Sequence, residues 1–156
     1  MVFVKISVVL TGLIVFTQCL KTDVSQCQNG GPVPNVTLTS NGVVCRQSPC
    51  NVYTGHAANI LVDFISPFYT EQMKPNLTAI AAGAVVPWPS NQKNACDGIT
   101  NTACPIVKGE HVIYSYKMDI LSLFPEIYAT LIFSLANEAD GQLATCFTVG
   151  LQILKH

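Results

Sequence analysis

Charged residues are scarce in this chain of 156 residues, at 11% of the sequence, and the formal net charge is −1. No run of like charge occurs along the chain. A protein that binds nucleic acid or an acidic membrane surface through electrostatics needs a concentration of basic residues. The composition therefore makes both poor candidates for electrostatic partners.

Familiar catalytic motifs are also missing. The sequence contains no Gly-x-Ser-x-Gly elbow, no His-x-x-x-His pair and no glycine-rich phosphate loop. The three histidines are scattered, and we expect His56 in a turn and His111 on the polar face of a strand. Nothing suggests a pair of carboxylates suited to acid–base catalysis. We therefore predict no catalytic residue, no metal site and no cofactor.

No long stretch has the periodicity of an amphipathic helix, and apolar residues instead alternate with polar ones. Four runs with this alternation cover residues 58–66, 110–118, 126–135 and 142–154. Turn-like stretches separate these runs. Several short strands with one apolar face indicate an antiparallel β-sandwich.

A further run, residues 79–90 (AIAAGAVVPWPS), combines five very small residues with the only tryptophan of the chain. As one continuous strand, it would place on a single face Ile80, Ala82, Ala84, Val86 and Trp88. Alanines on an inner face leave a volume between sheets about 10 Å apart, unless large residues opposite fill it. The pattern alone leaves open both a cavity and a filled core. Prolines on both sides of Trp88 cannot donate hydrogen bonds to a neighbouring strand, so the strand should end there. We therefore expect the indole at the rim of the sandwich.

The first 19 residues have the features of a secretory signal peptide. Lys5 precedes an apolar run, Ile6–Phe16, which is short for a bilayer span, and small residues follow it. We expect cleavage between positions 19 and 22 and one domain over residues 20–156. A retained anchor and a lipidated Cys19 are less favoured. Two sequons fit a glycosylated protein that is secreted or in the endolysosomal lumen, and they begin at Asn35 and Asn76.

Six cysteines remain in residues 20–156, and an even number behind a signal peptide indicates disulfides. Two pairs enclose only four and seven residues and can close local loops, which leaves the outermost pair to join the ends of the domain. The pairs favoured by this spacing are Cys45–Cys50, Cys96–Cys104 and Cys27–Cys146. A zinc site is the rival interpretation, which an oxidising compartment disfavours.

Four motifs stand in this cysteine frame: CRQSPC at 45–50, VVPWP at 85–89, CPIVKGEHVIYSY at 104–116 and FPEI at 124–127. Together they resemble the ML (lipid-recognition) domain family, and within it the Niemann–Pick type C2-like sterol and lipid transfer proteins. The resemblance spans essentially all of residues 20–156. It implies an immunoglobulin-like β-sandwich of about seven to eight strands, with an apolar cavity between the sheets and the same three disulfides.

The resemblance also implies a ligand site. In the sterol-transfer members, the pocket mouth is lined by an aromatic residue between two prolines and by a loop with an aliphatic residue and an aromatic residue. The matching positions here are Trp88, Ile120 and Phe124. The inner strand positions of the pocket match Val86, Tyr114, Phe133, Phe147 and Val149.

Several positions depart from the family pattern. The mouth aromatic is commonly phenylalanine, and Phe133 and Phe147 stand where the sterol-transfer proteins have tryptophans. Positions that are often bulky in sterol carriers are occupied by Ala58, Ala82 and Ala84. These departures concern the identity of the ligand more than the existence of a pocket.

We therefore expect a non-enzymatic, monomeric carrier of one sterol or fatty-acid-like ligand. Its partners would be that lipid and a donor or acceptor membrane or membrane protein. Two alternatives remain. One is a secreted recognition protein for microbial lipids, in innate immunity or chemosensation, and the other is an adhesion-type sandwich with a filled core.

Overall fold

The computed structural model describes residues 20–156, so the predicted signal peptide lies outside the described residues. Within this range the chain forms ten strands and one short 3-10 helix. Their bounds are β1 Ser25–Gln26, β2 Asn35–Ser40, β3 Val43–Cys45, β4 Cys50–Tyr53, β5 Ala57–Ile65, β6 Met73–Ala81, β7 Ala84–Pro87, η1 Ala95–Gly98, β8 His111–Asp119, β9 Ile127–Asn137 and β10 Leu143–Leu154. None of the helical structure in this range is long and apolar enough to cross a membrane.

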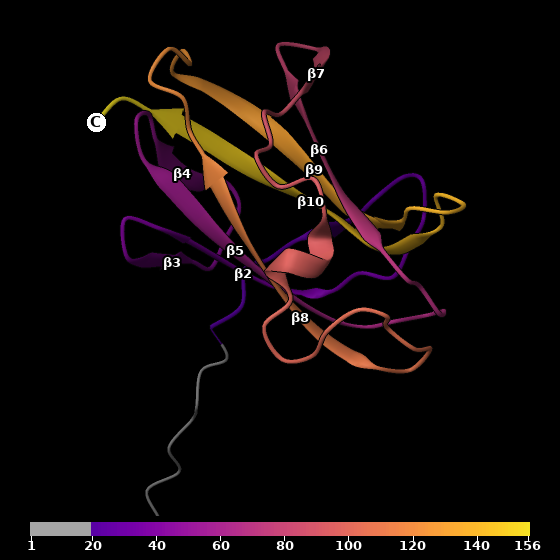
Figure 1. The fold of residues 1–156 in the computed structure, drawn as a ribbon. Helices are drawn as coiled ribbons and strands as arrows, with labels where there is room; N and C mark the ends of the chain where they lie inside the picture. The colour runs from indigo at the N-terminus through magenta and orange to yellow at the C-terminus, as the bar shows by residue number, and fades with distance from the viewer. Residues whose placement is uncertain (1–19) are drawn as a thin grey trace, which may run out of the picture.

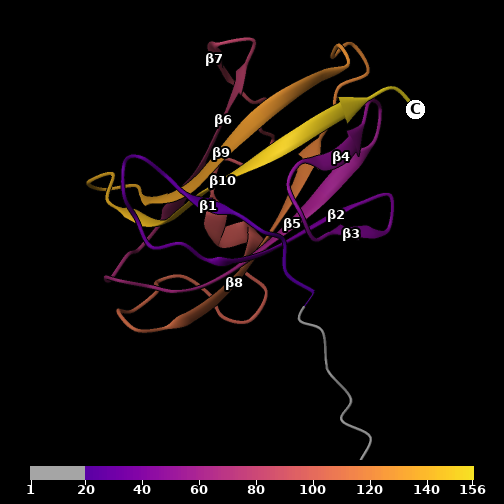
Figure 2. The same ribbon diagram turned by 180° about the vertical axis from the view of Figure 1, so that it is seen from behind.

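The strands form two sheets that pack against each other (Figures 1 and 2). The first sheet has the order β1-β10-β9-β6-β7, and β4 also pairs with β10. The second sheet has the order β3-β2-β5-β8. All pairings are antiparallel except β4 with β10. The predicted all-β sandwich is confirmed, and short strands such as β1 and β3 raise the count above the expected seven to eight.

The period-two alternation produces the core, as predicted. β5 buries every second side chain from Ala58 to Phe64, and β8 does the same from Val112 to Met118. These faces meet the buried side chains of β9 and β10. The buried polar member of the β10 run is satisfied, because the Thr145 hydroxyl donates to the Pro32 carbonyl at 2.9 Å.

The expected single strand over residues 79–90 is wrong, because the chain turns back within it. β6 ends at Ala81, β7 begins at Ala84, and the two strands form an antiparallel hairpin. Ala82 and Gly83 make the turn, with φ of 48° and 79°. Positive φ at both central residues is the geometry of a type I′ hairpin turn, whose twist matches that of the flanking strands. Ala82 is therefore at the hairpin tip and not on an inner face.

All three predicted disulfides are present, with Cα–Cα distances of 5.5 to 5.8 Å. They are Cys27–Cys146, Cys45–Cys50 and Cys96–Cys104. These distances lie within the usual range for disulfides. The zinc interpretation of these cysteines is therefore excluded.

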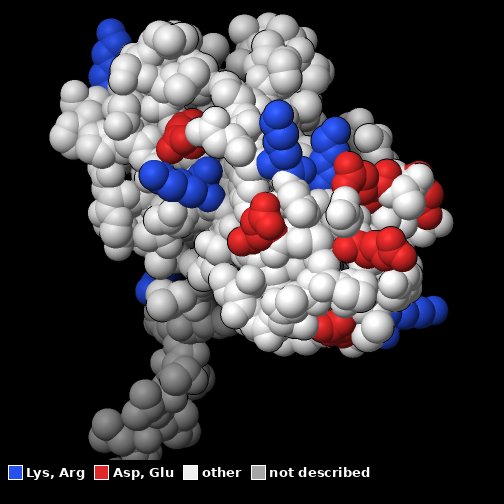
Figure 3. All heavy atoms as spheres, viewed as in Figure 1, with Lys and Arg blue, Asp and Glu red and all other residues white. Residues whose placement is uncertain are grey.

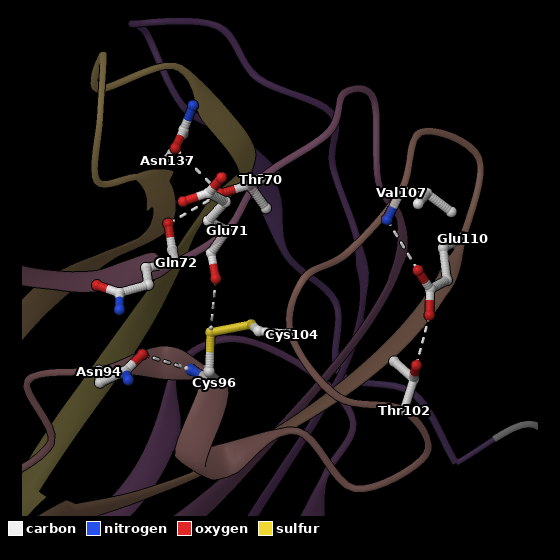
Figure 4. The surroundings of a disulfide bond; sticks show 10 residues. All are labelled: Thr70, Glu71, Gln72, Asn94, Cys96, Thr102, Cys104, Val107, Glu110 and Asn137. Atoms are coloured by element: carbon white, nitrogen blue, oxygen red, sulfur yellow. Dashed lines mark hydrogen bonds between the residues drawn. A yellow bond between two sulfur atoms is a disulfide. The ribbon is translucent and has the colours of Figure 1, made fainter.

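The Cys96–Cys104 disulfide fastens the long connection between β7 and β8 (Figure 4). In the same connection, the Glu110 carboxylate accepts hydrogen bonds from the Thr102 hydroxyl and from the Val107 N–H, the latter at 2.9 Å. These two bonds lower the pKa of Glu110, with Thr102 contributing most. The connection is thus held by its own polar contacts as well as by the disulfide.

The three disulfides close loops of very different length, so their removal should have unequal effects. We expect Cys27→Ala with Cys146→Ala to lower the free energy of unfolding by about 5 kcal/mol, because the pair closes a loop with a sequence separation of 119. Cys45→Ala with Cys50→Ala should cost about 2 kcal/mol, since its separation is only 5. Urea unfolding without reductant measures both, and equal losses would contradict the expectation.

Candidate functional site: an apolar cavity under Trp88 and Phe124

Two segments meet at one end of the sandwich, which is the upper end in Figure 1. One is Pro87-Trp88-Pro89, which begins at the last residue of β7, and the other contains Phe124 in the β8–β9 connection. The two rings pack edge to face, with centroids 5.2 Å apart and an interplanar angle of 76°. We call this pair, Trp88 and Phe124, the cover. Trp88 is only 6% exposed, so the predicted rim residue is in fact a buried one.

Beneath the cover lies a cavity of about 310 Å³, which is near the lower end of the usual range for small-molecule sites. Its walls come from β6, β7, β9, the end of β10 and the cover segments. The lining residues are Ala79, Ala81, Val86, Pro87, Trp88, Pro89, Phe124, Pro125, Ile127, Ala129 and Ile153. No charged side chain is among them.

The small size of the wall residues creates this space. Ala81 lies opposite Ala129 in the β6–β9 ladder and opposite Ala84 in the hairpin, which gives a row of three alanines across neighbouring strands. Ala79 follows on the same face of β6, opposite Val86. The alanines that line this cavity are Ala79, Ala81 and Ala129. Neither Ala82 nor Ala84 lines the cavity.

The eight residues predicted for the ligand site fall into two groups. Val86, Trp88 and Phe124 line the cavity. The other five are buried in the core outside its lining: Tyr114, Ile120, Phe133, Phe147 and Val149.

Aromatic rings fill the middle of the sandwich. Phe133 stacks on Phe147 with centroids 5.3 Å apart, and Tyr116 meets Phe133 edge to face at 5.6 Å. The ring centroid of Tyr114 lies 6.1 Å from that of Phe133, so Tyr114 belongs to the same aromatic group. These rings extend across the gap between the sheets, so the cavity occupies one end of the sandwich and not its centre.

The segment after the cover is tied to the second sheet. We call residues 90–92 the strap. The buried Tyr114 hydroxyl donates to Gln92 Oε1 at 2.9 Å, and Asn91 Nδ2 donates to Asp119 Oδ2 at 3.2 Å. Burial raises the pKa of Tyr114, so its hydroxyl stays protonated and available as a donor. The strap thus links β7 and β8, the edge strands of the two sheets.

The histidines do not form a second site. His111 Nε2 lies 2.8 Å from Asp63 Oδ1 in an exposed pair on the second sheet. The rings of His56 and His156 lie 4.3 Å apart at the surface. Among residues 20–156, no group of three or more His, Cys, Asp or Glu side chains could hold a metal ion.

Sequence reasoning missed most of the cavity wall, including Ala79, Ala81, Ile127, Ala129 and Ile153. Ile127, Ala129 and Ile153 lie in the alternating runs 126–135 and 142–154, which their alternation predicts as strands. The hairpin was the missing information, because it brings Ala79 and Ala81 onto the face that Val86 shares. The turn dipeptide Ala82-Gly83 was the only available signal, and it is weaker than Asn-Gly or Asp-Gly.

The fold and the site together define a disulfide-bonded β-sandwich with an uncharged cavity at one end. The family model for the ML domain matches residues 21–153. The chain therefore belongs to the ML domain family, whose members are lipid-recognition proteins and typically non-enzymatic.

Individual relatives agree with this assignment. The chain is 23% identical to mouse NPC intracellular cholesterol transporter 2 over 151 residues, covering 97% of each chain. It is 22% identical to the mite group 2 allergen Tyr p 2 of Tyrophagus putrescentiae, covering 91% of this chain and 89% of the allergen. The fold matches a Niemann-Pick type C2 protein from the Japanese carpenter ant with a TM-score of 0.71 and 16% identity, over 85% and 99% of the two chains.

The bond between Tyr114 and Gln92 can be tested by a double-mutant cycle. We expect Tyr114→Phe and Gln92→Ala to show a coupling of about 1 kcal/mol in the free energy of unfolding, because each change removes the same buried hydrogen bond. Urea unfolding of the four proteins measures the coupling. Tyr128→Phe, at an exposed tyrosine of β9, combined with Gln92→Ala is the matched control and should be additive. A coupling no larger than that of the control would show that the bond does not hold the strap.

Proposed function

We propose that this protein is a non-enzymatic carrier that binds one sterol or fatty-acid-like ligand in the cavity beneath Trp88 and Phe124. The observation that supports this most directly is the cavity itself. Its lining consists only of alanine, valine, isoleucine, proline, phenylalanine and tryptophan residues. Burial of apolar ligand surface supplies about 25 cal/mol per Å². Because the lining carries no charge, the protein loses little favourable hydration when an apolar ligand replaces water there.

The ligand would enter between the two cover residues. These residues belong to different connections, so they can separate without breaking a strand ladder. We propose that Val86, which is 43% exposed, forms the outer wall of the entrance. The five core residues of the predicted site would contact the ligand only if it extends deeper than the cavity.

A membrane or a membrane protein is the proposed source and destination of the ligand. Two large apolar side chains close to the entrance are strongly exposed, Val85 at 67% and Leu123 at 80%. Residues 79–90 contain no charge, and the surface over the β6–β7 hairpin is white in Figure 3. An uncharged apolar rim allows close approach to an apolar phase at the cavity entrance.

We further propose that the protein works outside the cell or in the endolysosomal lumen. Its disulfides are stable in such oxidising compartments. Both sequon asparagines, Asn35 on β2 and Asn76 on β6, are exposed and accessible to a glycan. A mobility shift after enzymatic deglycosylation of the secreted protein tests this part of the proposal.

Lipid extraction and mass spectrometry of the purified protein test the carrier function directly. We expect one sterol or fatty-acid-like molecule per chain. An extract without lipid, together with no uptake of added sterol or fatty acid, would instead favour a sandwich without a carrier role.

Filling the cavity should prevent binding without harming the fold. We expect Ala81→Leu to weaken binding of the extracted lipid about tenfold, because the added carbons occupy space that the ligand needs. Stability should be unchanged or slightly higher, since partly exposed Ala81 borders free volume. Ala139→Leu, in the exposed turn between β9 and β10, is the control and should bind normally. Equal binding by both variants would place the ligand elsewhere.

A further inference from the structure

Trp88 carries a polar atom with no partner. Within residues 20–156, its indole Nε1 is the one buried side-chain nitrogen or oxygen that makes no hydrogen bond. The large majority of buried polar groups in native proteins are satisfied, and an indole N–H can only donate. An orphaned donor at this position therefore calls for an explanation.

The surroundings hold Trp88 in place without satisfying this donor. Its backbone N–H donates to the Leu77 carbonyl at 3.1 Å, and prolines flank it on both sides. Its ring meets Phe124 edge to face. An aromatic face is a weaker acceptor than an oxygen atom, so an oxygen that reached the indole N–H would be preferred.

No other side chain of the lining can donate a hydrogen bond. The ten remaining lining residues are alanine, valine, proline, phenylalanine or isoleucine. Three of them are prolines, which also lack a backbone N–H. Trp88 is therefore the only lining residue whose side chain carries a hydrogen-bond donor.

The charges near the cavity indicate which oxygen fits. No cationic side chain lines the cavity, and acidic residues, Asp119 and Glu126, stand at both ends of the loop that carries Phe124. The exposed Lys155 follows two residues after the lining residue Ile153, and its backbone N–H donates to Glu126 Oε1 at 2.9 Å, but its side chain is outside the lining. A carboxylate placed there would lose its hydration without gaining a counter-charge. An alcohol, ketone or ester oxygen avoids this loss.

We propose that the Trp88 N–H donates a hydrogen bond to an uncharged oxygen at one end of the apolar ligand, and so selects that class of ligand. This inference rests on the proposed carrier function. Protein atoms cover the N–H, so the proposal requires the indole to turn about its side-chain bonds as the ligand enters. The ring then remains part of the cover while its N–H meets the ligand oxygen.

Three probes of equal chain length test this proposal on the delipidated protein: 1-decanol, n-decane and decanoate at pH 7. Calorimetry measures their binding to the native protein and to Trp88→Phe, which keeps an aromatic ring but removes the N–H together with part of the ring area. The lost area affects all three probes, so we expect Trp88→Phe to weaken 1-decanol binding about five- to tenfold more than n-decane binding. Decanoate should bind the native protein more weakly than 1-decanol.

The single tryptophan supplies a second readout. Emission from Trp88 in the native protein should shift to longer wavelength with 1-decanol, because the indole gains a hydrogen bond, and not with n-decane. Circular dichroism establishes that Trp88→Phe is folded.

Each failure has a distinct meaning. If 1-decanol and n-decane lose affinity equally in Trp88→Phe, the donor role is wrong while the carrier function stands. Tighter binding of decanoate than of 1-decanol would overturn the selection of an uncharged oxygen. If none of the probes binds the native protein, the proposed function fails and this inference fails with it.

Discussion

The gap between the two sheets is the constraint on which the rest of the structure depends. Sheets of a sandwich lie about 10 Å apart, and side chains from both inner faces must fill that distance. In the middle, large rings such as Tyr116, Phe133 and Phe147 do so. At the hairpin end, Ala81 and Ala129 are neighbours in the β6–β9 ladder of the first sheet, and their methyl groups are too short to fill that distance. The cavity therefore results from residue size at regular strand positions, and not from a defect in either sheet.

Residues in the connections between strands close the hairpin end of the sandwich. Trp88 follows the last residue of β7, and Phe124 lies between β8 and β9, so neither ring is held by a strand on both sides. The strap adds two side-chain hydrogen bonds to β8. In the proposed carrier, opening of the cover would therefore cost only a few local contacts, while the strand ladders and the disulfides stay intact. The proposed function requires this separation between a permanent frame and an entrance that opens.

Much of the frame could be predicted from the sequence because its signals are local. Alternation identified the buried faces of β5 and β8, and cysteine spacing identified the disulfides. The hairpin could not be predicted, since Ala82-Gly83 is a weak turn signal and the flanking residues alternate through it. The extent of the cavity could not be predicted either. Alternation gives the face on which Phe133 lies, but not how far its ring reaches across the gap.

Tyr114 connects the filled part of the sandwich to the cover. Its ring packs against Phe133 in the core, and its hydroxyl holds Gln92 in the strap. A ligand that fits the cavity leaves this ring in place. A ligand that extends deeper between the sheets must displace the aromatic group, and the same movement would release Gln92 and loosen the segment next to Trp88. In the proposed carrier, Tyr114 would therefore couple the depth of the site to the opening of its cover, so that a longer ligand would also keep its own entrance open.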